Sequence, residues 1–182
     1  MKVIRWFIFL GSLFFCLSGY TQNPRSHLIF YDFGTVDFNV NSLYKYQNGM
    51  ELSNWNLLAV SFEDTVDSGN TWKLQFMASA SEIQSDGSST NLDLATIELL
   101  IEDGGGTTDL TSYIEPSGDG DDDFDLQAGS WVTVISGAPQ GSFKDNRVRI
   151  SYKCGKGSVS LMNKSPDYYT VDIYYRLSET VE

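Results

Sequence analysis

Apolar and polar residues alternate along several short stretches of the chain, most clearly in residues 71–79. Every second residue there is large or apolar, and the residues between them are mostly polar. The apolar positions are Trp72, Leu74, Phe76 and Ala78. A period of two is typical of a strand with one face in a core and the other toward water. The pattern predicts a half-buried β-strand.

The same alternation recurs at residues 147–154 and 168–177, so two more strands are expected near the end of the chain. In the second stretch one face carries Tyr169, Val171, Ile173, Tyr175 and Leu177. Further strands are expected at 28–40 (two, joined by a bend at 33–35), 57–62, 94–101, 110–114 and 131–135. Residues 44–56 and 81–91 are polar and weakly patterned, which predicts loops.

Gly and Asn turn signals separate these short stretches, and no helical period of 3.6 is sustained. Many short strands at regular spacing are typical of a sandwich or a barrel. We expect an all-β fold, a single-domain antiparallel β-sandwich. At 182 residues the chain is long enough for one domain with a real core.

The first 19 residues have the features of a signal peptide. Lys2 and Arg5 precede an apolar run at 7–17, and Ser18 or Gly19 offers a small residue for cleavage. The predicted organisation is a signal peptide at 1–19, a short polar lead at 20–27 and the sandwich at 28–182. We therefore expect an exported protein of the cell surface, periplasm or extracellular space, with no transmembrane segment after cleavage.

Removal of residues 1–19 leaves ten basic residues against 24 acidic ones, a formal net charge of −14. Binding to nucleic acid or to an anionic membrane depends on clustered Lys and Arg, so both are poor partners. Cleavage also leaves Cys154 as the one cysteine, which excludes an intramolecular disulfide. Its place in the alternation of 147–154 points the thiol inward, with an intermolecular disulfide as the alternative.

Several residues in order along the chain resemble the signatures of the WxL (Trp-x-Leu) cell-surface domains. Asp64-Thr65, Gly69 and then Trp72-x-Leu74 are similar to the family's first signature. Tyr169, five residues and then Tyr175-Arg176-Leu177 resemble its closing Tyr-x5-Trp-x-Leu, with Tyr175 in place of the second Trp. Residues 33–35, Phe-Gly-Thr, resemble its opening strand. The resemblance spans nearly the whole chain after the signal peptide.

The resemblance implies a β-rich exported domain that attaches without covalent linkage to the cell wall, with peptidoglycan as the usual ligand. It makes Trp72, Leu74, Tyr169, Tyr175 and Leu177 the signature positions. Their alternation points these side chains inward, so they are expected to define the fold, and direct contact with the wall is the alternative.

The equipment for catalysis is sparse. The single histidine, His27, falls in the predicted polar lead, where it is poorly placed to activate a nucleophile, and one His with one Cys does not make a zinc site. Nothing singles out a pair of carboxylates for glycoside hydrolysis. We expect no enzyme activity and no cofactor.

An acidic tract offers a candidate calcium site. Asp119, Asp121, Asp123 and Asp125 supply hard oxygen ligands in a short loop, although the positions that an EF-hand loop gives to Gly and to its last Glu hold Phe124 and Ser130. A solvated acidic turn is the alternative.

Aromatic residues in the predicted loops are candidates for stacking against sugars, whose apolar faces pack on exposed rings. Trp55 lies between Asn54 and Asn56, and Tyr44, Tyr46 and Tyr113 have similar polar surroundings. The alternative is that these rings fold back onto the ends of the sandwich.

Together these features predict a secreted, non-catalytic module that binds cell-wall or extracellular polysaccharide or docks on a surface assembly. Two other functions stay open. One is a structural, pilin-like subunit of a surface polymer, in which a strand of one chain completes the sheet of the next. The other is a carbohydrate-active enzyme.

Overall fold

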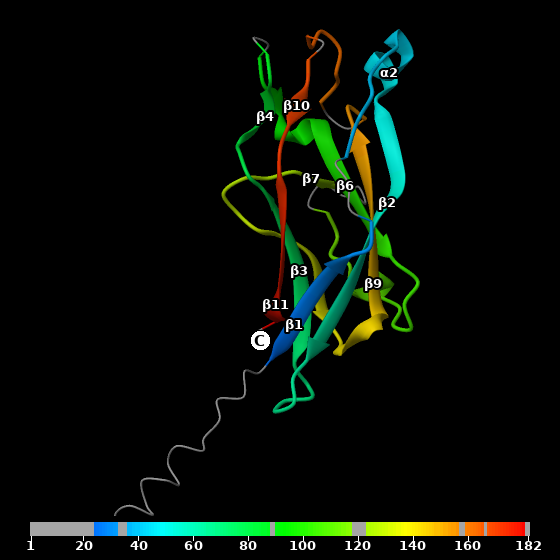
Figure 1. Cartoon of the computed structure of the whole chain (residues 1–182), viewed down its shortest axis with the longest axis vertical. Helices are drawn as coiled ribbons and strands as arrows, with labels where there is room; N and C mark the ends of the chain where they lie inside the picture. The colour runs from blue at the N-terminus through cyan, green and yellow to red at the C-terminus, as the bar shows by residue number, and fades with distance from the viewer. Residues whose placement is uncertain are drawn as a thin grey trace, which may run out of the picture.

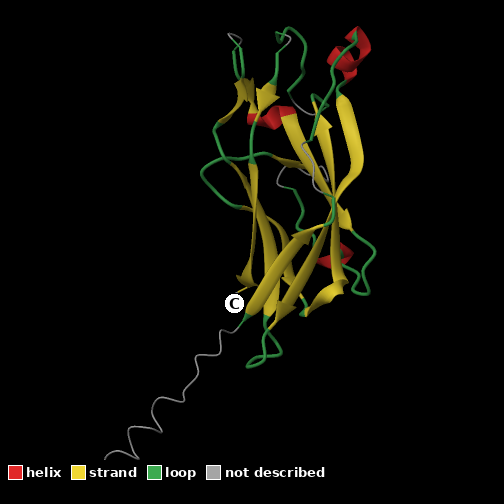
Figure 2. Ribbon diagram, viewed as in Figure 1, coloured by secondary structure: helices red, strands yellow, loops and turns green. Residues whose placement is uncertain are grey.

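The computed structural model describes residues 24–32, 36–87, 90–117, 123–156, 159–165 and 167–180. All strand pairs between its named strands are antiparallel, and the sheets pack as a sandwich (Figures 1 and 2). The predicted all-β sandwich is therefore confirmed. The predicted signal peptide lies outside the described residues.

The largest sheet has five strands in the order β1, β2, β9, β6, β7. Their bounds are β1 Arg25–Phe30, β2 Met50–Glu63, β9 Gly141–Cys154, β6 Ile97–Asp103 and β7 Asp123–Asp125. β2 and β9 are 14 residues long each and pair with each other along most of the sheet. β1 and β7 form its two edges.

Two three-stranded sheets complete the fold. One has the order β11, β3, β8, with bounds Ile173–Thr180, Thr71–Ala78 and Val132–Ala138. The other has the order β10, β4, β5, with bounds Tyr169–Thr170, Glu82–Ser85 and Leu92–Asp93. The helices are α2, Leu43–Asn48, and the 3-10 turns η1, Leu94–Thr96, and η2, Thr111–Tyr113.

The core lies between the large sheet and β3. Trp72, Leu74 and Phe76 of β3 have no exposed surface, as the alternation predicts. They pack with large side chains of β2, β6, β8 and β9, among them Leu58, Phe62, Leu99, Ile135 and Ile150, which are also fully buried or nearly so. Each such side chain stabilises the fold by about 1.5–3 kcal/mol relative to an exposed one.

The two stretches that resemble family signatures are neighbours in the fold. β11 pairs with β3 so that Leu177 lies opposite Leu74 and Tyr175 opposite Phe76. Tyr175 and Leu177 point toward the core and are partly buried. The first and last signatures therefore form one ladder, although about a hundred residues separate them.

A buried polar network joins the two layers. The Tyr152 hydroxyl of β9 donates to Asn56 Oδ1 of β2 at 2.8 Å and lies 3.1 Å from the Tyr175 hydroxyl of β11. Asn56 Nδ2 donates to the Asp32 carbonyl at 2.7 Å, just beyond β1. The Phe30 ring packs edge-on against Tyr175 with ring centroids 5.4 Å apart. These contacts fix β11, and the segment of β1 and Asp32, to the centre of the large sheet.

Residues 44–56 were expected to be a loop, and this expectation is wrong. The Ser42 side chain caps α2 by accepting from the Lys45 amide at 3.3 Å, and Gly49, at φ 67°, ends the helix. β2 then begins at Met50. α2 has six residues and none is buried, so it shows no apolar stripe that a pattern could reveal.

Other element bounds also differ from expectation. β1 starts at Arg25, inside the predicted lead, and residues 36–40 are not in a strand although they alternate in burial. β4 lies in the predicted loop 81–91.

Two 3-10 turns also differ from expectation. Asp93 caps the turn η1 before β6, and residues 111–113 form η2 rather than a strand. Residues 171–172 separate β10 from β11, because the Asp172 backbone bonds Ser79. The predicted bend at 33–35 lies outside the described residues.

The Tyr152 network predicts a difference between two conservative variants. Tyr152→Phe leaves both Asn56 Oδ1 and the Tyr175 hydroxyl without their partner, so it is expected to lower the free energy of unfolding by about 1–3 kcal/mol. Tyr175→Phe leaves the bond between Tyr152 and Asn56 intact, so its expected cost is about 1 kcal/mol or less. Urea unfolding followed by tryptophan fluorescence measures both. Equal losses in the two variants would contradict this account of the network.

Candidate functional site

The signature residues lie in the core rather than on the surface. Trp72 is fully buried, and its indole N–H donates to the Pro139 carbonyl at 2.8 Å. Leu74 is fully buried, and Tyr169, Tyr175 and Leu177 pack partly buried against the core. These side chains hold the two layers together and leave little surface for a ligand.

The turn before Trp72 is organised by one carboxylate. Asp64, which is 9% exposed, accepts from the amides of Val66 and Asp67 at 2.8 and 3.0 Å and from Asn70 Nδ2 at 2.6 Å. Gln140, in the β8–β9 turn, accepts from the Asp64 amide at 2.8 Å and donates to the Asp67 carbonyl at 2.8 Å. The Asp-Thr turn and the indole are therefore both anchored to the same hairpin, which gives this motif a structural role.

Of the four aromatic residues predicted to stack on a ligand, two are exposed. Tyr44, on α2, is 72% exposed, and Trp55 is 41% exposed. Tyr46 and Tyr113 are partly buried and pack against the core. Trp55 was expected in a loop, and this expectation is wrong because it lies inside β2.

A bulge in β2 explains how a strand residue comes to present an indole to solvent. Leu52 pairs with Tyr152 and Asn56 with Ile150, so three residues of β2 lie opposite Ser151 alone. Asn54 takes the left-handed conformation, at φ 53°, and its amide donates to Ser151 Oγ at 2.8 Å. Bulges bend a strand and redirect its side chains, and they are frequent beside binding sites.

Polar side chains surround the bulge. Ser53 Oγ donates to Glu51 Oε1 at 2.7 Å, and Lys156 forms an ion pair with Glu51 at 2.5 Å. The hydrogen bonds from Lys156 and then Ser53 hold the pKa of Glu51 below its usual range. The exposed indole of Trp55 therefore has the exposed Asn54 beside it in the chain. Glu51, on the same strand, is paired with Lys156, which follows the end of β9.

More exposed apolar side chains lie at one end of the sandwich. Figure 1 shows α2, β4 and β10 together at the end opposite turn 64–70. Tyr168, just before β10, is 80% exposed. Asp167 fixes its position by accepting from the Ser85 hydroxyl and from the Gly87 amide at 3.1 Å. Tyr168 is not among the predicted stacking residues, although the alternation that turns Tyr169 toward the core turns its neighbour outward.

The predicted calcium ligands are only partly described. Asp119 and Asp121 lie outside the described residues, while Asp123 and Asp125 lie on β7. Asp123 forms an ion pair with Lys153, and this hydrogen bond raises the pKa of Lys153. Within the described ranges no three His, Cys, Asp or Glu side chains gather as a metal site would require.

Cys154, at the end of β9, is a free and buried thiol. Burial raises its pKa to about 11, so the nucleophilic thiolate is scarce at neutral pH. In the native fold Cys154 is therefore a small apolar side chain of the core.

Comparison with known proteins gives no family: no protein-family model and no curated protein matches this sequence. The resemblance to WxL domains stays a prediction. Among the described residues, no helix has the length and apolar character needed to cross a membrane.

The buried thiol predicts a change in alkaline stability. An unfolded cysteine releases its proton near pH 9, whereas Cys154 in the native fold does so near pH 11. Between these values only the unfolded state is ionised, so the free energy of unfolding falls by about 1.4 kcal/mol per pH unit from this group, and below pH 9 the group contributes no pH dependence. Urea unfolding from about pH 8 to 11 should show a shallower fall for Cys154→Ala.

The Cys154→Ala curve should keep some slope, because burial also raises the pKa of Tyr152 and of Tyr175. Identical alkaline slopes in the parent and variant proteins would show that the thiol is not shielded in the native state.

Proposed function

We propose that this chain is an exported, non-catalytic surface module that binds cell-wall or extracellular polysaccharide through Trp55. The observation that supports this most is the bulge in β2, which presents Trp55 to solvent from the half of the strand that pairs with β9 alone. Bulky aromatic side chains on strands normally stabilise a protein by burial. An exposed indole on a rigid strand is suited to binding instead.

The chemistry around Trp55 fits a sugar. A sugar ring has an apolar face that packs on an indole and hydroxyl groups at its edge that need hydrogen-bonding partners. Asn54 offers an amide and Glu51 a carboxylate close by in the same strand, and both residues are exposed. The backbone N–H of Asn54 donates to Ser151 Oγ, which leaves the side-chain amide of Asn54 available. Because this bond holds the backbone of the bulge, the strand would lose little conformational freedom when a ligand binds.

A polymer chain would contact more than one ring. α2, with the exposed Tyr44, leads directly into β2. Figure 1 shows β10, which the exposed Tyr168 immediately precedes, at the same end of the molecule as α2. These aromatic side chains supply further contacts for a long glycan along this end of the sandwich.

The arrangement of β1 supports a binding module over a strand-exchanging subunit. β1 pairs with β2 of its own chain over six residues, and its Leu28 and Phe30 pack against the core. A subunit that waits for a strand from a neighbour would leave such a place open. We therefore propose a module that binds as a self-contained sandwich, in the manner that the WxL resemblance implies.

Trp55→Ala is expected to weaken retention of the purified protein on insoluble wall polysaccharide by about tenfold or more, because the variant removes the stacking surface. Trp55→Phe keeps a smaller ring and should lose less. Tyr174→Ala is the matched control, since Tyr174 is 50% exposed but lies on β11 of another sheet.

Co-sedimentation at a range of polysaccharide concentrations measures these affinities. Unchanged retention of Trp55→Ala, or an equal loss in Tyr174→Ala, would contradict the assignment of Trp55.

A further inference from the structure

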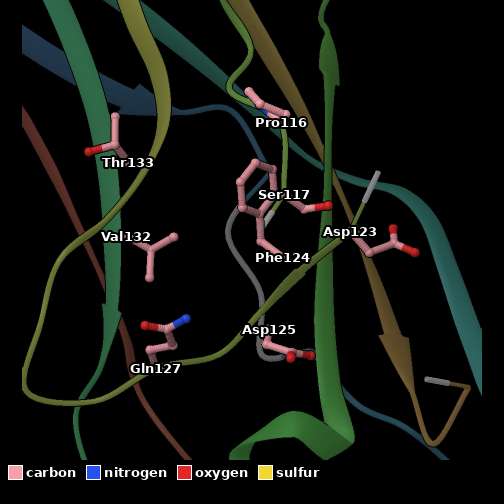
Figure 3. Close-up of a pocket in the computed structure, with 8 residues that line it drawn as sticks. All are labelled: Pro116, Ser117, Asp123, Phe124, Asp125, Gln127, Val132 and Thr133. Atoms are coloured by element: carbon pink, nitrogen blue, oxygen red, sulfur yellow. The ribbon is translucent and has the colours of Figure 1, made fainter. Parts of the chain in front are cut away.

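A second candidate site lies away from Trp55, between the edge strands of the two main sheets. A cavity of about 320 Å³ opens between β7 and β8. Its lining comprises Pro116, Ser117, Asp123, Phe124, Asp125, Gln127, Val132 and Thr133. Figure 3 shows Gln127, Val132 and Thr133 on one side and the two aspartates on the other, with Phe124 between them.

Two polar atoms of this lining are buried without a partner. Ser117 is 8% exposed, and its Oγ has no hydrogen-bonding partner in the described part of the chain. Asp123 Oδ1 is also buried and unpaired, while Oδ2 of the same carboxylate pairs with Lys153. Native proteins satisfy nearly all such groups, so either an ordered water or the hydroxyl groups of a ligand are expected to pair these two atoms.

The opposite wall of the cavity is held in place by a chain of contacts. Thr133 Oγ1 accepts from Gln75 Nε2 at 2.9 Å. Gln75 Oε1 in turn accepts from Arg176 Nε and Nη2 at 3.1 and 2.6 Å. The Arg176 guanidinium stacks on Trp131, 4.4 Å from the ring centroid. A wall fixed in this way favours binding, because little side-chain freedom is lost.

The lining also limits the chemistry of the ligand. Phe124, Val132 and Pro116 give apolar contacts, and the hydroxyl, amide and carboxylate groups of the other residues accept hydrogen bonds. Asp125 disfavours an anion, and so does Asp123 to the extent that its partner Lys153 leaves its charge uncompensated. The volume is at the lower end of the range of about 300–1,000 Å³ that ligand pockets occupy.

We propose that this cavity binds one neutral sugar ring, with Asp123 Oδ1 and Ser117 Oγ bonding its hydroxyls and Phe124 and Val132 contacting its apolar face. The site is a second subsite of the polysaccharide binding proposed for Trp55, and it rests on that function. Its specificity excludes sugars that carry a carboxylate or phosphate.

The test is a titration of the ¹⁵N-labelled protein with glucose, N-acetylglucosamine and glucuronate, each up to about 50 mM, a range suited to weak single-ring binding. The neutral sugars should cause saturable shifts of the amide signals of Ser117, Phe124 and Thr133. Glucuronate should bind at least about threefold more weakly, because its charge meets Asp125 and an Asp123 charge that Lys153 offsets only in part. Equal binding of glucuronate would overturn the neutral specificity.

Ser117→Ala should weaken the binding of the neutral sugars at the cavity by about fivefold to tenfold. The same variant should keep its stability without sugar, because Ser117 Oγ makes no hydrogen bond that the substitution breaks. Ser81→Ala, at an exposed serine, is the matched control and should bind as the parent does. A full-strength response in Ser117→Ala would exclude the proposed contact.

The same spectra separate this proposal from the previous one. Shifts at residues 53–56 with none at the cavity would overturn the cavity site and leave Trp55 as the binding surface. Shifts at the cavity alone, with wall binding unaffected by Trp55→Ala, would support the cavity and overturn the role of Trp55. The absence of shifts at both places with all three sugars would overturn both.

Discussion

The pairing of β3 with both of its neighbours is the constraint on which the rest of the structure depends. β3 is the middle strand of its sheet, and the apolar side chains at its alternate positions are fully buried against the large sheet. The indole of Trp72 both fills the core and bonds the β8–β9 hairpin. A shift of β3 by one residue would turn these rings to solvent, so the register is strongly determined.

The large sheet shows how such a rigid frame can present a large side chain to solvent. β2 and β9 pair on both sides of the bulge. Residues 53–55 lie opposite Ser151 alone, so they are not paired in the ladder and bulge outward. The Asn54 backbone adopts a conformation that Asn tolerates better than most residues, and Ser151 satisfies its amide. Trp55 is consequently exposed, and the backbone beside it is held by this hydrogen bond. The scaffold is stabilised by the core, which leaves this segment available for binding.

Sequence patterns predicted the strands that lie half-buried in regular ladders. β3, β9 and β11 each show alternation because one face meets the core. The pattern did not predict the elements whose formation depends on tertiary structure. α2 buries no residue and so has no stripe, and the bulge interrupts the period of β2 just where Trp55 lies. The cavity was beyond reach, because Ser117, Asp123 and Val132 come from three segments whose proximity follows from sheet order.

The acidity of the chain is compatible with the ligand class that both candidate sites indicate. A net charge near −14 after the predicted cleavage opposes anionic partners at long range but has little effect on neutral hydroxyl groups. At short range, carboxylates are good acceptors for sugar hydroxyls, and Glu51 and Asp123 each have a lysine partner that offsets their charge. An acidic surface is therefore compatible with the proposed neutral polysaccharide, because its carboxylates supply hydrogen-bond acceptors. In the proposed function, charge would select the class of partner, and Trp55 and the cavity would provide the surfaces that fit it.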